Sequence, residues 1–232
     1  MAPPPSELKA RIAERIDARE PFAVWTPTDF LDLGNRDAVD KALQRLAKSG
    51  KIRRIERGLY DMPRTSRLTR APTPPDYRQV IEALTRRDQT RMLIDGMTAA
   101  NDLGLTDAVP ARVVVHTDAR RRSIRLGNIV IEFKKTVPRR LYWAGRPAMR
   151  VVQALHWLKD MLPTEEQRIA AHLRGSLDDP THGPAIRDDL RRGLPTLPRW
   201  MQRIVSALLD SADDDRAAGA ARHARRKRSV SQ

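Results

Sequence analysis

The side chains best placed to do chemistry in this sequence are basic ones that alternate with apolar ones. The stretch KIRRIERGLYDMP, which begins at Lys51, interleaves lysine and arginine with isoleucine, leucine and tyrosine. From Lys41 to Arg70 the chain has ten Lys or Arg residues against two acidic ones. Such a density of Lys and Arg is typical of surfaces that contact phosphate groups, and phosphate contacts dominate the affinity of nucleic-acid binding. The pattern therefore predicts a surface that binds a polyanion.

The composition of the whole chain favours the same partner and excludes other classes of protein. Its 232 residues carry 44 Lys or Arg against 29 Asp or Glu, a formal charge of +15, which attracts polyanions at long range. The absence of cysteine excludes disulfides, thiolate zinc sites and iron–sulfur clusters. No apolar run is long enough to span a membrane, and the initial MAPPPSELKA lacks the apolar core of a signal peptide. We expect a cytoplasmic protein with no membrane partner.

No motif in the sequence indicates a cofactor or a metal. The histidines have no metal-ligand spacing, and neither a phosphate-binding loop nor a dinucleotide fingerprint is present. We therefore expect no enzymatic activity. One alternative stays open, because Asp118, Glu132 and Lys134 follow the pattern of a metal-dependent nuclease, in which carboxylates hold Mg²⁺ and a lysine assists the attacking water. Short patterns of this kind arise often by chance, and a surface strand of mixed charge is the simpler interpretation.

The basic stretch needs elements to position it, and the residues before it predict three helices. The first begins near Ser6 and carries an apolar stripe at every fourth position. A short second helix begins after the N-cap Thr26 and ends at Gly34. A third begins after the N-cap Asn35 and ends at Gly50. The basic stretch follows this third helix directly.

The basic stretch itself predicts a hairpin with its turn at Gly58. Ile52 and Ile55 are three residues apart, which would place them on opposite faces of a regular strand, so we expect a bulge or bend near Arg53 and Arg54. Helix, short helix, helix and hairpin in this order are typical of a winged helix-turn-helix, whose third helix enters the major groove of DNA. We assign this domain to residues 1–62.

The remaining chain predicts a second domain of mixed structure. A proline-rich linker is expected over residues 63–75, a domain with a small sheet and helices over 76–212, and a disordered acidic-then-basic tail over 213–232. The expected strands are residues 92–94, 113–116, 123–125 and 129–133. The predicted fold class is α+β: an N-terminal winged helix-turn-helix followed by a mixed α/β domain with a small sheet and a helical C-terminal part.

The segment TPTDFLDLGNRDAVDKALQRLAKSGKIRRIERGLYDMP resembles the winged helix of AbiEi-like antitoxins from type IV toxin–antitoxin systems. The later pieces GMTAANDLGL, DAVPARVVVHTD, RLGNIVIEFKK and VPRRLYWAG are similar to that family in the same order, so the resemblance covers about residues 6–209. It implies an antitoxin with a role in phage defence. Such a protein represses its own operon through the winged helix and counters a nucleotidyltransferase-like toxin without a stable complex.

The predicted DNA-binding residues lie on the third helix and on the hairpin, which is the wing. Arginine can pair bidentately with guanine and glutamine with adenine, whereas wing arginines are better suited to phosphates or the minor groove. The candidates are Arg36, Lys41, Gln44, Arg45, Lys48, Lys51, Arg53, Arg54 and Arg57.

A second basic cluster is a candidate antitoxin surface, because a basic face could engage the same target as a toxin that acts on RNA or nucleotides. Its residues are Arg120, Arg121, Arg122, Arg125, Lys134, Lys135, Arg139 and Arg140. A solvated sheet face that helps to hold DNA is the alternative. The terminal RHARRKR would add only affinity without sequence preference.

The expected partners are operator double-stranded DNA with inverted repeats and the nucleotidyltransferase-like toxin. No heptad or apolar strip indicates a stable dimer, so a monomer that binds half-sites cooperatively and a weak homodimer both stay open. Two other functions also stay open: a winged-helix regulator with a ligand-sensing second domain, and the metal-dependent DNA-processing enzyme.

Overall fold

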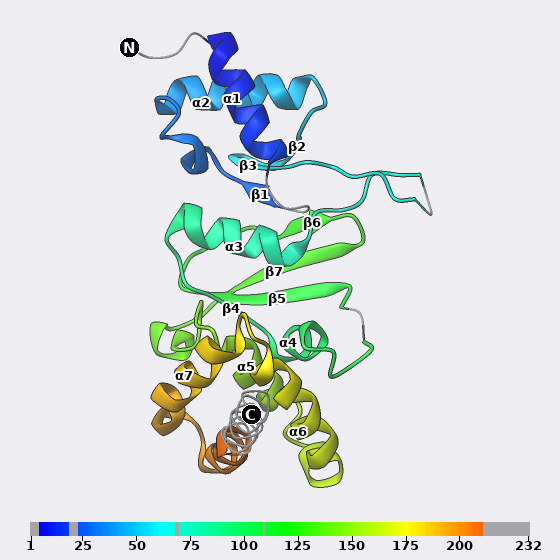
Figure 1. Cartoon of the computed structure of the whole chain (residues 1–232), viewed down its shortest axis with the longest axis vertical. Coiled ribbons are helices and arrows are strands. Elements are labelled where there is room, and N and C mark those ends of the chain that lie inside the picture. The colour runs from blue at the N-terminus through cyan, green and yellow to red at the C-terminus, as the bar shows by residue number, and fades with distance from the viewer. Residues whose placement is uncertain (1–4, 19–22, 68–69, 109, 211–232) are drawn as a thin grey trace, which may run out of the picture. The chain divides into compact units, whose positions relative to one another are not determined.

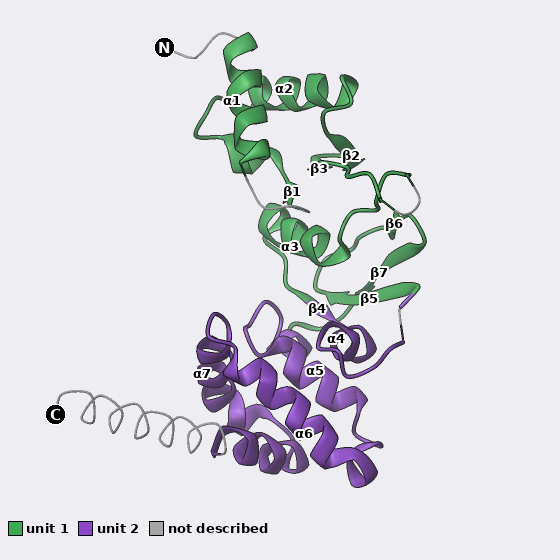
Figure 2. Cartoon of the chain, turned by 45° about the vertical axis from the view of Figure 1, so that its right-hand side comes forward, with its two compact units in different colours: residues 1–92, 111–138 green, residues 93–110, 139–232 purple. Residues whose placement is uncertain are grey.

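The computed structural model describes residues 5–18, 23–67, 70–108 and 110–210. The fold is α+β, with N-terminal helices and a small antiparallel sheet, then a mixed sheet, then a helical part (Figure 1). The chain divides into two compact units, one of residues 1–92 and 111–138 and the other of residues 93–110 and 139–232 (Figure 2).

The first unit begins with the element order of a winged helix-turn-helix. Its elements are α1 (Pro5–Asp17), β1 (Val24–Trp25), η1 (Pro27–Phe30), α2 (Arg36–Lys48), β2 (Arg53–Glu56) and β3 (Leu59–Asp61). The three strands form an antiparallel sheet in the order β1-β3-β2. The sequence did not predict β1, because two residues are too few to show an alternating pattern.

The predicted helix starts are confirmed by their capping contacts. The Thr26 backbone N–H donates to Asp29 Oδ2 at 2.7 Å, and the short helix η1 follows. The Ala38 N–H donates to the Asn35 side chain at 2.9 Å, and α2 follows. Such caps satisfy backbone groups that the first helical turn leaves without partners. The Asn35 contact fixes where α2 begins.

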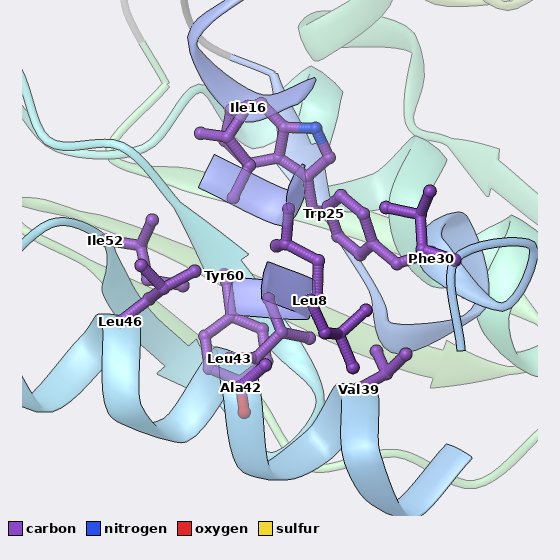
Figure 3. Close-up of a cluster of buried hydrophobic side chains, with 12 residues drawn as sticks. Leu8, Ile16, Trp25, Phe30, Val39, Ala42, Leu43, Leu46, Ile52 and Tyr60 are labelled. Carbon is purple, nitrogen blue, oxygen red and sulfur yellow. The ribbon is translucent and has the colours of Figure 1, made fainter. Parts of the chain in front are cut away.

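One apolar cluster holds α1, α2 and the small sheet together. In Figure 3, Leu8 and Ile16 of α1 lie beside Trp25, Leu43 and Tyr60, and all five are at most 3% exposed. Burial of side chains of this size contributes about 1.5–3 kcal/mol each. The every-fourth-residue stripe predicted for the first helix is therefore its core face.

The hairpin has the predicted turn and the predicted irregularity. Gly58 has a φ of +68°, which glycine adopts without steric cost. Arg54 pairs with Tyr60 and Glu56 with Leu59, so Ile55 is the extra residue of a bulge. The bulge lies one residue beyond the expected position, and it reconciles the spacing of the isoleucines with a strand.

The mixed sheet has the order β4-β5-β7-β6, with β5 and β7 parallel and β6 and β7 antiparallel. Its strands are β4 (Met92–Ile94), β5 (Arg112–Thr117), β6 (Ile124–Leu126) and β7 (Ile129–Lys135), and α3 (Tyr77–Asp88) precedes them. All four strands were predicted at nearly these positions. The parallel pairing of β5 with β7 was not.

The segment predicted as a linker pairs with itself. Thr65 and Pro72 form an antiparallel bridge, and the Ser66 N–H donates to the Ala71 carbonyl at 2.9 Å. The predicted domain boundaries at 62 and 76 stay a prediction. The first compact unit contains both the winged-helix elements and strands β5 to β7.

The second unit is mainly helical. It contains α4 (Gly96–Asp102), most of η2 (Pro138–Leu141), α5 (Met149–Trp157), α6 (Leu162–Asp178), α7 (Gly183–Gly193), η3 (Leu194–Thr196) and helical residues 199–210. Helices α4 and α5 approach closely at Gly96, where a Cβ atom would lie 2.5 Å from Cβ of Trp157. In the part of the chain that the structure describes, no helix has the length and apolar character to cross a membrane.

Candidate nucleic-acid interface

Helix α2 presents a polar outer face above its buried one. Val39, Leu43 and Leu46 face the core, and each is at most 2% exposed. The five residues predicted on this helix to bind DNA are all exposed: Arg36, Lys41, Gln44, Arg45 and Lys48. The helical period thus gathers every predicted contact of α2 on the side away from the core.

The outer face of α2 keeps most of its charge unneutralised. Arg36 Nε lies 3.0 Å from Asp40 Oδ2, an exposed pair one helical turn apart, which contributes only about 0.3–0.5 kcal/mol. Among the described residues, no side chain forms an ion pair or hydrogen bond with Lys41, Arg45 or Lys48. The C-terminal half of the helix therefore has cations available for an external anion.

Tyr60 places the wing beside the N-terminal half of α2. Its ring is buried, and burial raises the pKa of its hydroxyl above the usual 10.0. The charges of Arg54, Asp40 and Arg36 also act on this hydroxyl. Arg54 is the direct partner of Tyr60 across the hairpin, so their two side chains project from the same face of the small sheet, and Tyr60 packs there with Leu43 of α2.

The four predicted wing cations differ in how firmly they are held by the protein itself. Lys51 Nζ lies 2.8 Å from an Asp17 carboxylate oxygen, in an exposed pair. Arg53 forms a two-pronged pair with Asp61, at 3.0 Å from Nε and 2.5 Å from Nη2, and the Asp61 side chain is only 6% exposed. Arg54 and Arg57 are exposed. Arg53 therefore faces partly inward, and Arg54 faces outward.

A cluster of four charged residues supports the wing from below, and we call it the wing brace: Glu56, Arg87, Asp88 and Arg121. The guanidinium groups of Arg87 and Arg121 each lie 2.9 Å from Oε1 of Glu56. Arg121 also contacts the Asp88 carboxylate, and Arg87 donates to the carbonyl of Arg57 at 2.7 Å. The brace thus joins the wing turn to the end of α3 and to the segment after β5.

The position of Arg121 in the wing brace separates it from the exposed cations around it. Its side chain is 13% exposed, and burial lowers its pKa. Its guanidinium carbon lies 5.2 Å from the centre of the Phe133 ring on β7. This residue was predicted on an antitoxin surface, but the structure gives it a packing role within the first unit.

The other residues of the predicted antitoxin surface are exposed, but they do not all belong to one unit. Those in the first unit are Arg120, Arg122, Arg125, Lys134 and Lys135. Arg139 and Arg140 belong to η2 in the second unit.

The two carboxylates of the nuclease pattern pair with different arginines in the structure. Asp118 pairs with Arg91 at 3.1 Å, and Glu132 pairs with Arg112 at 3.3 Å. Lys134 is exposed on β7. Within the described ranges, no three His, Cys, Asp or Glu side chains lie close enough to hold one metal ion.

The sequence predicted neither the wing brace nor the separate ion pair of Arg53 with Asp61. Those two residues are direct partners across the hairpin because the bulge at Ile55 shifts the register by one residue. Arg121 and Glu56 are 65 positions apart, and no local pattern links them.

Comparisons with known proteins complete the description of the chain. No curated protein matches it. Among solved structures it is similar to the crystal structure of the RV2827C protein from Mycobacterium tuberculosis, with 18% identity over 89% of this chain and 77% of that one, and a TM-score of 0.37. Residues 11–177 match the model of DUF6088, described as a family of unknown function, and this chain belongs to that family.

Proposed function

We propose that the protein is a DNA-binding antitoxin of the AbiEi-like kind, which represses its own operon and counters a nucleotidyltransferase-like toxin. The observation that carries the DNA-binding part is the outer face of α2. It is exposed, its lysines have no partner in the described residues, and a wing with exposed Arg54 and Arg57 follows it.

The dimensions of α2 suit the major groove of duplex DNA. Its 13 residues make a helix about 20 Å long, and the groove is about 12 Å wide, which admits a helix. Gln44 lies at mid-helix between Lys41 and Lys48, where it could pair with an adenine edge while the lysines contact phosphates. Arg36 would exchange Asp40 for a guanine at little cost, because their exposed pair is weak.

The antitoxin part of the proposal rests on the sequence resemblance. The similar pieces GMTAANDLGL and VPRRLYWAG fall largely in α4, in η2 and just after it. Arg139, Arg140 and Tyr142 are exposed in this region, and Tyr142 is 40% exposed. We assign the toxin-countering surface to these residues of the second unit, acting without a stable complex with the toxin.

DNA binding can be tested by selecting duplexes from a random pool with the full-length protein. The expected result is an enriched inverted repeat that also occurs upstream of the protein's own reading frame. Gln44→Ala should lower affinity for that site by about 1–3 kcal/mol and relax the preference at one base pair. Arg11→Ala, an exposed arginine on α1, is the control. Enrichment of no sequence would overturn the proposal.

The antitoxin proposal predicts that a gene next to this one encodes a nucleotidyltransferase-like protein, and co-expression of the two proteins tests the antitoxin activity. The proposal expects growth to be rescued, with no complex recovered when the two proteins are purified together. Failure of the full-length protein to rescue growth would contradict the antitoxin assignment and leave the DNA-binding assignment to its own test.

A further inference from the structure

A groove of about 250 Å³ lies in the first unit beside the wing. Three arginines and six uncharged residues line it, and no acidic side chain does. The lining comes from β2, from the segment after the hairpin, from β6 and from the turn between β6 and β7: Arg53, Arg54, Ile55, Pro72, Pro74, Pro75, Arg125, Leu126 and Gly127.

The three arginines leave hydrogen-bond donors for an anion. Arg53 uses Nε and Nη2 for Asp61, and Arg54 uses Nε for the Glu56 carbonyl at 3.3 Å. Arg125 is exposed on β6, and no described side chain forms an ion pair with it. The groove therefore keeps a net positive charge even though Asp61 neutralises one of its three arginines. Guanidinium groups can bind two phosphate oxygens at once through parallel N–H groups.

The walls of the groove are apolar and stiff. Proline restricts its own backbone, and Pro72, Pro74 and Pro75 form one side. Gly127 has a φ of +60°, and a Cβ there would lie 3.3 Å from Cβ of Pro74, so the turn approaches this side closely. A free phosphate ion would make little contact with such walls. A phosphate followed by a deoxyribose ring would bury apolar sugar atoms against them.

The groove shares Arg53 and Arg54 with the wing that follows α2. Arg54 links the groove to the rest of the winged helix, since it lines the groove and pairs across the hairpin with Tyr60, which packs in the same cluster as Leu43 of α2. A duplex in contact with α2 and the wing would therefore bring its flanking backbone toward Arg125.

We propose that this groove binds the sugar–phosphate backbone of duplex DNA, so that the DNA interface extends from the wing onto the β6–β7 hairpin. Arg125 then belongs to the DNA-binding surface and not to the antitoxin surface. The inference rests on the proposed DNA-binding function and adds to it a contact outside the winged-helix residues.

The salt dependence of duplex binding tests the contact. Arg125→Ala should reduce the log–log slope of affinity against salt by about 0.9, the value for one phosphate contact. The ratio of the duplex affinity of the unsubstituted protein to that of Arg125→Ala should thus fall about threefold between 50 and 200 mM salt. Arg122→Ala is the matched control, because Arg122 is an exposed arginine just before β6 that does not line the groove. An equal slope change in both variants, or none in Arg125→Ala, would overturn the inference.

A chemical probe can place the contact on the DNA, because the natural chain has no cysteine. A hydroxyl-radical-generating iron chelate attached through Arg125→Cys should cut the duplex backbone at one position flanking the selected site. The same chelate at Arg122→Cys should cut weakly or without preference for position. The groove assignment would be contradicted if the chelate at Arg125→Cys cut the duplex no more strongly than the chelate at Arg122→Cys.

Two outcomes separate this inference from the proposed function. If the unsubstituted protein selects no duplex, the proposed function fails and the groove assignment fails with it. If it selects a duplex and Gln44→Ala weakens binding while Arg125→Ala matches its control, only the groove assignment fails. Arg125 contributes a share of the affinity for duplex DNA. If single-stranded DNA or inorganic phosphate removed that share as well as duplex DNA does, the groove assignment would also be contradicted, because the groove would not be selective for a duplex backbone.

Discussion

Arg53 and Arg54 are neighbours in the sequence, yet their guanidinium groups have different partners. Arg53 is bound on two of its nitrogens by Asp61, a buried carboxylate, whereas Arg54 is exposed and, within the described residues, donates only to a backbone carbonyl. The bulge at Ile55 lies next to this pair. At the scale of single residues, a basic wing therefore combines a structural arginine with ones available to DNA.

This difference predicts unequal effects of alanine on stability. Arg53→Ala leaves the Asp61 carboxylate buried without its partner, so the free energy of unfolding should fall by about 1–3 kcal/mol. Arg54→Ala removes an exposed side chain and should change it by less than about 0.5 kcal/mol. Urea unfolding of both variants measures this, and equal losses would contradict the structural role of Arg53.

Tyr60 predicts a loss of stability in alkali. Burial raises the pKa of its hydroxyl in the folded state, so above about pH 10 the unfolded chain releases this proton while the folded chain keeps it. The unfolded state then binds fewer protons, and the free energy of unfolding falls as pH rises through that range. Tyr60→Phe should flatten this fall in unfolding titrations between about pH 9 and 11. An unchanged slope would contradict the assignment.

At the scale of elements, the wing depends on the brace beneath it. Arg121→Ala removes a mostly buried guanidinium from Glu56 and Asp88, and should lower the free energy of unfolding by about 1–3 kcal/mol. Arg121→Lys should not restore it, because one ammonium cannot reproduce the two contacts that Nη1 and Nη2 make with separate carboxylates. Hydrogen exchange at the hairpin amides should rise in both variants. Exchange no faster than in Arg122→Ala would show that the brace does not hold the wing.

The elements themselves were largely readable from the sequence, for local physical reasons. Thr26 and Asn35 are caps, and Gly50 and Gly58 adopt positive φ angles that glycine allows. The predicted exposure of α2 follows from its helical period. The features that the sequence did not predict are the parallel pairing of β5 with β7 and the burial of Arg121. Both depend on contacts between residues far apart in the chain, which sequence spacing does not encode.

At the scale of the whole molecule, the proposed activities fall on different parts of the chain. Lys41→Ala on α2 should lose operon repression and keep rescue from the toxin. Charge reversal of Arg139 and Arg140 together should lose rescue and keep repression, since both are exposed in the second unit. A reporter fused to the operator and a growth assay measure the two outcomes. Loss of both activities in either variant, with normal unfolding, would contradict the separation.

The central claim is that α2 and the wing bind a particular duplex sequence. The most direct measurement is fluorescence anisotropy of the full-length protein with the duplex from upstream of its own reading frame and with a scrambled duplex of equal length, both at about 150 mM salt. The account predicts affinity at least about 10³-fold tighter for the first duplex, the lower range for specific DNA-binding proteins. Equal affinity for the two duplexes would contradict it, because a charge of +15 alone attracts both equally.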